Sequence, residues 1–278
     1  MSLFIASLNS GSNGNCYYIG NNTEAVLVDV GISCKEIEIR MERLNLSLKK
    51  VKAIFISHEH SDHIKGVVVL SRKYQLPVYI TPATLKYGRI KLDEGLNIVF
   101  KAYETISIGE LKVTAFPKFH DASDPHSFII EGNNTTVGVF TDIGRVYEHL
   151  SSHFSQCHAA FLEANYDEAM LDEGRYPAYL KTRIKGGEGH LSNIQALELF
   201  NSHRHSHLSH LFLSHLSKDN NDPELVQQLF EKNAGKTRIE IASRYNETAV
   251  YEIRTDNKLA QKTKPTRVPS QSMQMTLF

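Results

Sequence analysis

Short apolar runs separated by polar turns recur from residue 3 to residue 253, and they favour an α/β fold with many short strands. In the first part of the chain the runs predict strands at 3–8, 16–19, 25–28, 53–56 and 78–80. Apolar residues at helical spacing predict helices from about Ser33, over 67–74 and over 82–87. The last of these helices begins with Pro82, which suits a first helical turn.

The same pattern continues through the rest of the chain. It predicts strands at 98–100, 105–108, 111–116, 127–130, 136–141, 159–162, 208–213, 238–242 and 249–253. Helices are predicted over 177–185, from the capping-box sequence 192–195, and from Asp222, where Leu225 and Leu229 are spaced four residues apart. After Thr255 the sequence is polar and basic with two prolines, so we expect a folded domain at 1–254 and a flexible tail at 255–278.

Composition narrows the classes of function. The 31 basic and 31 acidic residues balance, so any surface that binds nucleic acid must be local. Cys16, Cys34 and Cys157 are widely spaced and form no CxxC pair, which is typical of reduced thiols in a cytosol. The N-terminus has no basic leader segment and no apolar run reaches membrane length. We therefore expect a cytoplasmic protein that makes no membrane contact.

The most informative stretch is 57–63, Ser-His-Glu-His-Ser-Asp-His, which directly follows an apolar strand. Imidazole and carboxylate groups are typical ligands of Zn, Mn or Fe. A solvated polar loop is the alternative reading of such a stretch. Against it, polar residues follow four other predicted strands in the same way, at Asp29, Asp142, Glu163 and His215. Because strand ends meet at one edge of an α/β sheet, this placement predicts a shared metal site.

The ligand types divide into two groups. His58 and His60 share one side of an extended segment, and His120 is a natural third ligand for a first metal. Asp62 and His63 lie further on and face a second metal, for which His215 completes the set. Asp142 is placed to bridge the two ions. Taken alone, His215 is also compatible with a core or surface histidine and Asp142 with a turn.

In order and spacing, these residues resemble the successive motifs of the metallo-β-lactamase fold. The resemblance extends to about residue 253 and implies a four-layer αββα sandwich with a binuclear metal site at one edge. It also implies that Asp29 orients the histidine cluster and is not itself a ligand.

A narrower resemblance is to the YycJ/WalJ exonuclease branch of this fold. The similar segments are 10–16 (Ser-Gly-Ser-Asn-Gly-Asn-Cys), 120–122, 141–144, 189–193 and 213–217. The branch implies a metal-dependent DNA exonuclease that digests 5′-to-3′ in replication and mismatch repair.

Two further features, both expected near the metal site, favour phosphodiester substrates. The basic residues Lys181, Arg183 and Lys185 can meet a nucleic-acid backbone, although an ordinary solvated helix face is an equal alternative. His190 precedes a predicted helix N-terminus, where it can contact a phosphate or protonate a leaving oxygen. The alternative for His190 is a structural loop histidine. The histidine run 203–207 could form another metal site, but the alternative of a solvated helix end is favoured because the site already has enough ligands.

The last five residues, Gln-Met-Thr-Leu-Phe, resemble the Gln-x-x-Leu-Phe peptide by which bacterial replication and repair proteins dock on the sliding clamp. Gln274 would supply hydrogen bonds, and Leu277 and Phe278 would be the apolar anchors of a tethered peptide. An indifferent tail is the alternative.

Together, these features predict a metal-dependent phosphodiesterase with two divalent ions, in which Asp62 and His190 handle protons. Two alternatives stay open. One is a hydrolase of a small ester, thioester or cyclic nucleotide on the same fold. The other is a non-catalytic DNA- or clamp-binding adaptor with structural metals.

Overall fold

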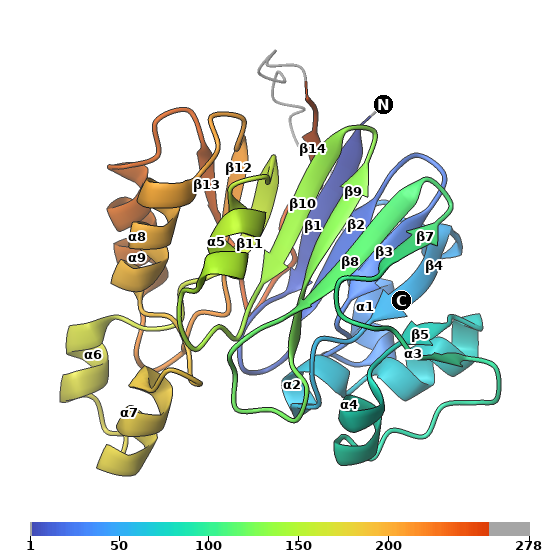
Figure 1. Cartoon of the computed structure of the whole chain (residues 1–278), viewed down its shortest axis with the longest axis horizontal. Helices are drawn as coiled ribbons and strands as arrows, with labels where there is room; N and C mark the ends of the chain where they lie inside the picture. Colours follow the sequence, from blue (N-terminus) through green and yellow to red (C-terminus); the bar gives the residue numbers. More distant parts are fainter. Residues whose placement is uncertain (1, 256–278) are drawn as a thin grey trace, which may run out of the picture.

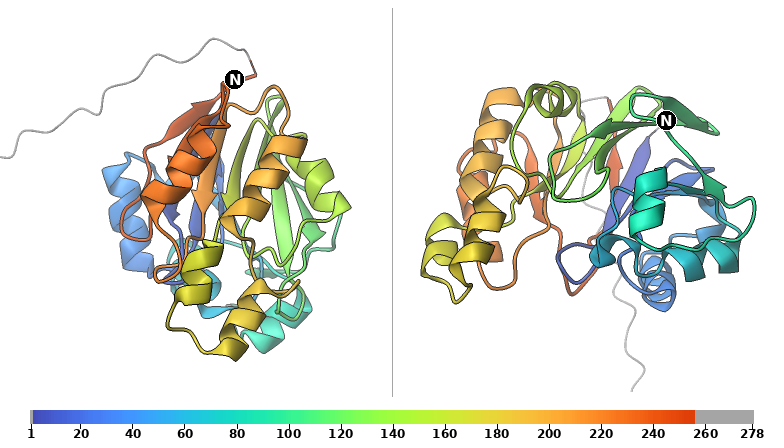
Figure 2. Two further views of the ribbon diagram at one scale, coloured as in Figure 1. Left: turned by 90° about the vertical axis from the view of Figure 1, so that its left-hand side faces the viewer. Right: turned by 60° about the horizontal axis from the view of Figure 1, so that its bottom comes forward.

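The structure, a computed structural model, describes residues 2–255. In this part of the chain, two mixed sheets of seven strands each pack face to face. Helices cover the outer face of each sheet, so the molecule has four layers, helix–sheet–sheet–helix (Figure 1). Viewed from below, the two halves lie side by side with their loops facing the viewer (Figure 2, right). The predicted αββα sandwich is confirmed.

The first sheet is built from the N-terminal half and closed by the last strand, in the order β14-β1-β2-β3-β4-β5-β6. Its strands are β1 Leu3–Asn9, β2 Cys16–Gly20, β3 Ala25–Val28, β4 Val51–Phe55, β5 Val78–Tyr79, β6 Asn97–Ile98 and β14 Tyr251–Ile253. Its helices are α1 Cys34–Arg43, α2 Ser61–Ile64, α3 Val67–Tyr74 and α4 Pro82–Tyr87, with a 3₁₀ turn at Leu48–Lys50. Strands β3 to β6 run parallel.

The second sheet has the order β13-β12-β11-β10-β9-β8-β7. Its strands are β7 Thr105–Ile108, β8 Leu111–Pro117, β9 His126–Gly132, β10 Thr135–Phe140, β11 Ala159–Glu163, β12 His210–Ser214 and β13 Arg238–Ile241. Its helices are α5 Glu148–Phe154, α6 Glu168–Glu173, α7 Ala178–Lys185, α8 Asn193–His203 and α9 Pro223–Glu231. Strands β10 to β13 run parallel, so their carboxyl ends meet at one edge.

Aromatic and branched side chains fill the space between the sheets. Tyr17 contacts Phe161 across this layer, with ring centroids 4.8 Å apart, and Phe55 contacts Phe128 at 5.7 Å. Each such buried side chain stabilises the fold by about 1.5–3 kcal/mol. The packed layer fixes the relative position of the two sheets, and therefore of the loops at their shared edge.

The predicted helices and strands largely coincide with those in the structure. The capping box at Ser192 is present, with its hydroxyl accepting from the Gln195 backbone and the Gln195 side chain accepting from the Ser192 backbone. Helices α5 and α6 were not predicted. In α9 the buried face carries Val226 and Phe230, which are also spaced four apart, whereas Leu225 is 40% exposed.

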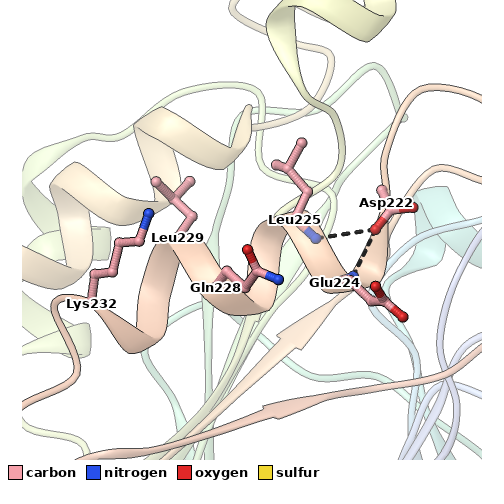
Figure 3. A pocket seen from close by; sticks show the side chains of 6 residues that line it. All are labelled: Asp222, Glu224, Leu225, Gln228, Leu229 and Lys232. Carbon is pink, nitrogen blue, oxygen red and sulfur yellow. Dashed lines mark hydrogen bonds between the residues drawn. The ribbon is translucent and has the colours of Figure 1, made fainter.

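Leu225 and Leu229 instead line an open hollow along the outer side of α9 (Figure 3). Asp222 caps this helix by accepting hydrogen bonds from the backbone N–H groups of Glu224 and Leu225. None of the predicted site residues lines this hollow. Within residues 2–255, no helix is long and apolar enough to cross a bilayer.

Candidate metal centre

The polar residues predicted at strand ends gather at one edge of the sandwich. Asp29 follows β3, His58 lies beyond β4, Asp142 lies beyond β10, Glu163 ends β11 and His215 follows β12. All five side chains are buried. Buried ionisable groups need partners. Asp29 is paired with His63, and His215 is paired with Asp142 and Glu163.

Three of these positions have left-handed backbone conformations, with φ of 60° at Asp29, 55° at Asp142 and 55° at His215. Such a conformation costs a non-glycine residue about 1–3 kcal/mol and persists only where surrounding contacts fix it. At His215 the backbone N–H donates to Ser10 Oγ over 2.8 Å. The fold therefore turns the chain sharply at the ends of these three strands and points the three side chains toward a common centre.

His58, His60 and His120 form one group of possible metal ligands. Nδ1 of His60 lies 3.1 Å from Nε2 of His58 and 3.2 Å from Nε2 of His120. Tetrahedral ligands at about 2.0–2.1 Å from a zinc ion are about 3.3 Å apart. The three imidazoles therefore have the spacing of ligands around one ion.

Asp62, His63 and His215 form a second group. Oδ2 of Asp62 lies 3.3 Å from Nε2 of His215 and 3.6 Å from Nε2 of His63. Asp142 lies between the groups, because its Oδ1 is 3.5 Å from Nε2 of His215 and 3.7 Å from Nε2 of His120. All seven predicted ligands thus come together.

Asp142 supplies the test of whether these residues fit a cation. Its Oδ2 is buried without a well-aligned donor in the described chain, yet it lies 3.1 Å from Nε2 of His63. The other nitrogen of His63, Nδ1, lies 2.7 Å from Asp29 Oδ2 and donates its proton there. Burial opposes a charge on His63, but Asp142, Asp29 and Asp62 raise its pKa to about 10, so without a metal Nε2 carries a proton toward the Asp142 oxygen. A divalent cation can take the place of this proton between Nε2 of His63 and the Asp142 carboxylate, so the donor set fits a metal.

The pKa shifts agree with this reading. Burial and the charge of His63 hold the pKa of His58 well below its ordinary value, and burial lowers the pKa of His120 to about 3. Both rings are therefore neutral and able to bind metal. Burial opposes the negative charge of Asp142, but His215 and His63 hold its pKa well below the usual range. Its carboxylate is ionised at neutral pH.

Comparison with known proteins agrees with the fold. A family model described as the metallo-beta-lactamase superfamily matches residues 10–181. The chain belongs to the metallo-β-lactamase superfamily.

Within the superfamily, the chain is similar to Exodeoxyribonuclease YycJ of Bacillus anthracis, with 36% identity over 245 residues that cover 84% of this chain and 92% of the relative. It is 34% identical to Exodeoxyribonuclease WalJ of Streptococcus pneumoniae over 239 residues, 82% of this chain and 88% of the relative. The chain therefore belongs to the YycJ/WalJ branch. The metallo-β-lactamase fold protein YhfI of Bacillus subtilis shares its fold, with a TM-score of 0.69 and 16% identity over 91% of this chain and 100% of YhfI.

Contacts behind the candidate ligands orient their side chains. Asp29 accepts from the backbone N–H and the hydroxyl of Ser57, each over 2.8 Å, in addition to His63. Nδ1 of His120 donates to the Gly189 carbonyl over 3.1 Å. Such partners fix the ring orientation of ligating histidines.

Two residues that sequence reasoning did not assign occupy the same layer. Oε1 of Glu163 lies 2.8 Å from Nδ1 of His190 and 3.1 Å from Nδ1 of His215. Nδ2 of Asn15 lies 3.0 Å from Nε2 of His63 and 3.3 Å from Oδ2 of Asp62. Glu163 carried a signal, its position at a strand end. Asn15 lies in the segment 10–16 that resembles the YycJ/WalJ branch, but no role was predicted for it, and its contact with His63 spans a sequence separation that only the tertiary fold closes.

His190 lies at the rim of the centre, with its side chain 20% exposed and its Nδ1 3.8 Å from Oδ1 of Asp142. Since Nδ1 donates to Glu163, Nε2 is the nitrogen available to a substrate.

The predicted basic residues of α7 lie outside the ligand groups. Lys181 donates to the backbone carbonyl of Asp172 over 2.7 Å, Arg183 pairs with Asp121, and Lys185 pairs with the Asp172 carboxylate. Their charges are therefore partly compensated within the protein. In the run 203–207, His203 ends α8, and His205 and His207 follow it; all three are exposed. Gln274, Leu277 and Phe278 lie outside the described residues.

Proposed function

We propose that this protein is a metal-dependent exodeoxyribonuclease. The observation that carries the proposal is the pair of ligand groups joined through Asp142. It is supported by the similarity over most of the chain to two relatives named as exodeoxyribonucleases. Binuclear centres of this kind suit the in-line displacement at phosphorus that phosphodiester hydrolysis requires.

His58, His60 and His120 would hold one divalent ion, and Asp62, His63 and His215 would hold a second, with Asp142 between them. When bound, the ions supply Lewis-acid activation of water and of the phosphoryl group. The ligand types suit Zn, Mn or Fe. Asp29 keeps the Nε2 lone pair of His63 directed at the centre by holding its Nδ1 proton.

His190 is the residue we assign to the leaving oxygen. Glu163 holds its Nδ1, so a proton on Nε2 is directed away from Glu163 and is available to the alkoxide that departs. Asp62 is a second candidate for proton handling, since its Oδ2 contacts both His215 and Asn15. The pH profiles of kcat for His190→Ala and for Asp62→Ala, measured separately, test the two assignments.

DNA is the proposed substrate, with 5′-to-3′ digestion and a role in replication or repair. Lys181, Arg183 and Lys185 border the loop that carries His190 and would contribute to binding the backbone once their internal partners exchange. Three buried, unpaired cysteines support a cytoplasmic location.

The deciding experiment is a panel of 5′- and 3′-labelled DNA and RNA with Mn²⁺ or Zn²⁺ added. Wild type should release mononucleotides from DNA, and His60→Ala and Asp62→Ala should lose at least 100-fold of that activity, about the loss of one essential group. His205→Ala, which removes an exposed histidine away from the centre, is the matched control. A wild type that leaves nucleic acid intact but cleaves a thioester contradicts the proposal. Full metal binding without any cleavage favours an adaptor.

A further inference from the structure

Arg145 is an exposed cation close to the metal centre. It lies in the loop between β10 and α5, three residues after Asp142, and its guanidinium stacks on the ring of Phe119 with 3.7 Å between Cζ and the ring centroid. In the described part of the chain its side chain makes no ion pair and no hydrogen bond. The basic residues of α7, by contrast, are engaged with Asp121 and Asp172. The donors of Arg145 are therefore free for a ligand.

Aromatic rings continue outward from Arg145 and Phe119. Tyr147 meets Phe119 edge-on at 5.0 Å between centroids, and His149 lies 6.5 Å from Tyr147. Tyr103 follows at 5.6 Å from His149, with its hydroxyl 3.2 Å from Nδ1 of that ring. We call Arg145 and the four rings, Phe119, Tyr147, His149 and Tyr103, the aromatic strip. Tyr103 is 51% exposed, and His149 is also exposed.

The strip begins at the metal centre. Phe119 directly precedes His120, and its carbonyl accepts from the backbone N–H of Gly144 over 2.6 Å. Gly144 packs so closely on the backbone of residues 187 and 188 that an added Cβ would lie 2.3 Å from the Gly187 carbonyl oxygen. The inner end of the strip is thus fixed by the same loops that carry His120, Asp142 and His190.

We propose that the aromatic strip binds the end of single-stranded DNA that enters the active site. Exposed rings stack on the faces of nucleobases, which every base offers, so they hold a strand without selecting its sequence. A guanidinium that is free of internal partners complements the backbone phosphate beside the cleaved bond. This inference rests on the proposed function, because an exonuclease needs contacts with its DNA substrate. The basic residues of α7 are engaged with internal partners, whereas the aromatic strip is free to supply these contacts.

The test is fluorescence anisotropy of metal-loaded protein with a phosphorothioate oligonucleotide of thymidines and with an abasic strand of equal length. Tyr103→Ala should weaken binding of the thymidine strand about tenfold, in line with the loss of one stacked base, and leave the abasic strand unchanged. Tyr103→Phe keeps the ring and should bind like wild type. Arg145→Ala should weaken binding of both strands and reduce the salt slope of log K by about 0.7, the value for one phosphate contact.

Arg238→Ala is the matched control, because Arg238 also stacks on an aromatic ring, 4.9 Å from the centroid of Tyr251, but begins β13 at the end away from the centre. It should leave both affinities unchanged. Hydrolysis of methyl p-nitrophenyl phosphate, which has no base, should also be unchanged in Arg238→Ala. If wild type digests DNA while Tyr103→Ala and Arg145→Ala bind as wild type does, the strip has no such role. If wild type neither binds nor digests DNA, the strip and the proposed function both fail.

Discussion

Nδ1 of His190 lies 2.8 Å from Oε1 of Glu163, a carboxylate that is completely buried at the end of β11. The other oxygen, Oε2, accepts from the backbone N–H groups of Ile143 and Leu191 over 2.8 and 3.1 Å. Glu163 therefore ties together the loop after Asp142 and the loop that carries His190. Burial alone would raise its pKa, but the charge of His190 and hydrogen bonds from His190 and His215 lower the pKa of Glu163 to about 2.

Glu163→Gln should reduce kcat about 10- to 100-fold, as expected for a group that orients others in a metal site. The amide keeps the shape, but one of its two termini is a donor and cannot accept from the histidines and backbone N–H groups around it. Steady-state kinetics at saturating metal measure the effect. If Glu163 acts through His190, the double variant with His190→Ala should be no slower than His190→Ala alone. Additive losses would show that Glu163 acts elsewhere.

Asn15→Ala should weaken metal binding by about 10- to 100-fold. The Asn15 amide contacts both Asp62 and His63, and its own carbonyl is fixed by the Gly11 backbone N–H over 3.0 Å. Without it, Asp62 loses the contact that orients it toward the centre. Competition with a chelator of known affinity gives the metal dissociation constant. Asn21→Ala is the control, since Asn21 is also buried but holds the turn between β2 and β3; equal effects would mean that the loss is only structural.

Gly31→Ala should destabilise the protein by about 3 kcal/mol and displace the cluster. A Cβ on Gly31 would lie 1.7 Å from the Asp62 carbonyl oxygen, which accepts from the Asn15 backbone N–H over 2.7 Å. No flexible side chain is there to give way, so the backbone must move. Urea unfolding of the variant measures the loss. Gly187→Ala, whose Cβ would come no closer than 3.5 Å to Arg145, should unfold as wild type does.

These contacts also show what was open to prediction from sequence. The strands and the ligand clusters were predictable because apolar runs stop where polar residues begin, and parallel strands bring those points to one edge. Helices α5 and α6 were missed because each is short and buries few residues, Leu150 and Phe154 in the first and Leu171 in the second. A face with so few apolar positions has no clear period.

The contacts behind the ligands could not be predicted for a different reason. Asn15 reaches His63 across 48 residues, and Glu163 reaches His215 across 52. Such pairs depend on the register of neighbouring strands and on the left-handed turns at Asp142 and His215, which leave no local sequence pattern. In the same way, composition identifies the basic residues of α7 but does not show that Arg183 pairs with Asp121.

The C-terminal peptide gives a prediction that is independent of the metal centre. Deleting residues 274–278 should abolish capture of the protein by a purified sliding clamp while leaving exonuclease activity unchanged, because the anchors are remote in sequence from every candidate ligand. Leu277→Ala with Phe278→Ala should have the same effect, and Thr276→Ala should have none. Capture that survives the deletion would rule out this docking mode.

Stability should fall in mild acid because of His210, which begins β12 away from the metal centre. Burial, together with the charge of Arg238, lowers the pKa of His210 to about 4. The unfolded chain binds a proton at this residue near pH 6.5, whereas the folded chain does not do so until about pH 4, so stability is lost as the pH falls between these values. From pH 7.5 to pH 5 the loss is about 2 kcal/mol for this residue.

Urea unfolding of metal-free protein at the two pH values measures this loss, with His210→Gln as the comparison. The glutamine does not titrate, so the variant should lose about 2 kcal/mol less than wild type over the same interval. The other histidines titrate in both proteins and cancel in the difference. Parallel pH profiles would mean that His210 is protonated as readily in the folded chain as in the unfolded one, and that its burial beside Arg238 carries no electrostatic cost.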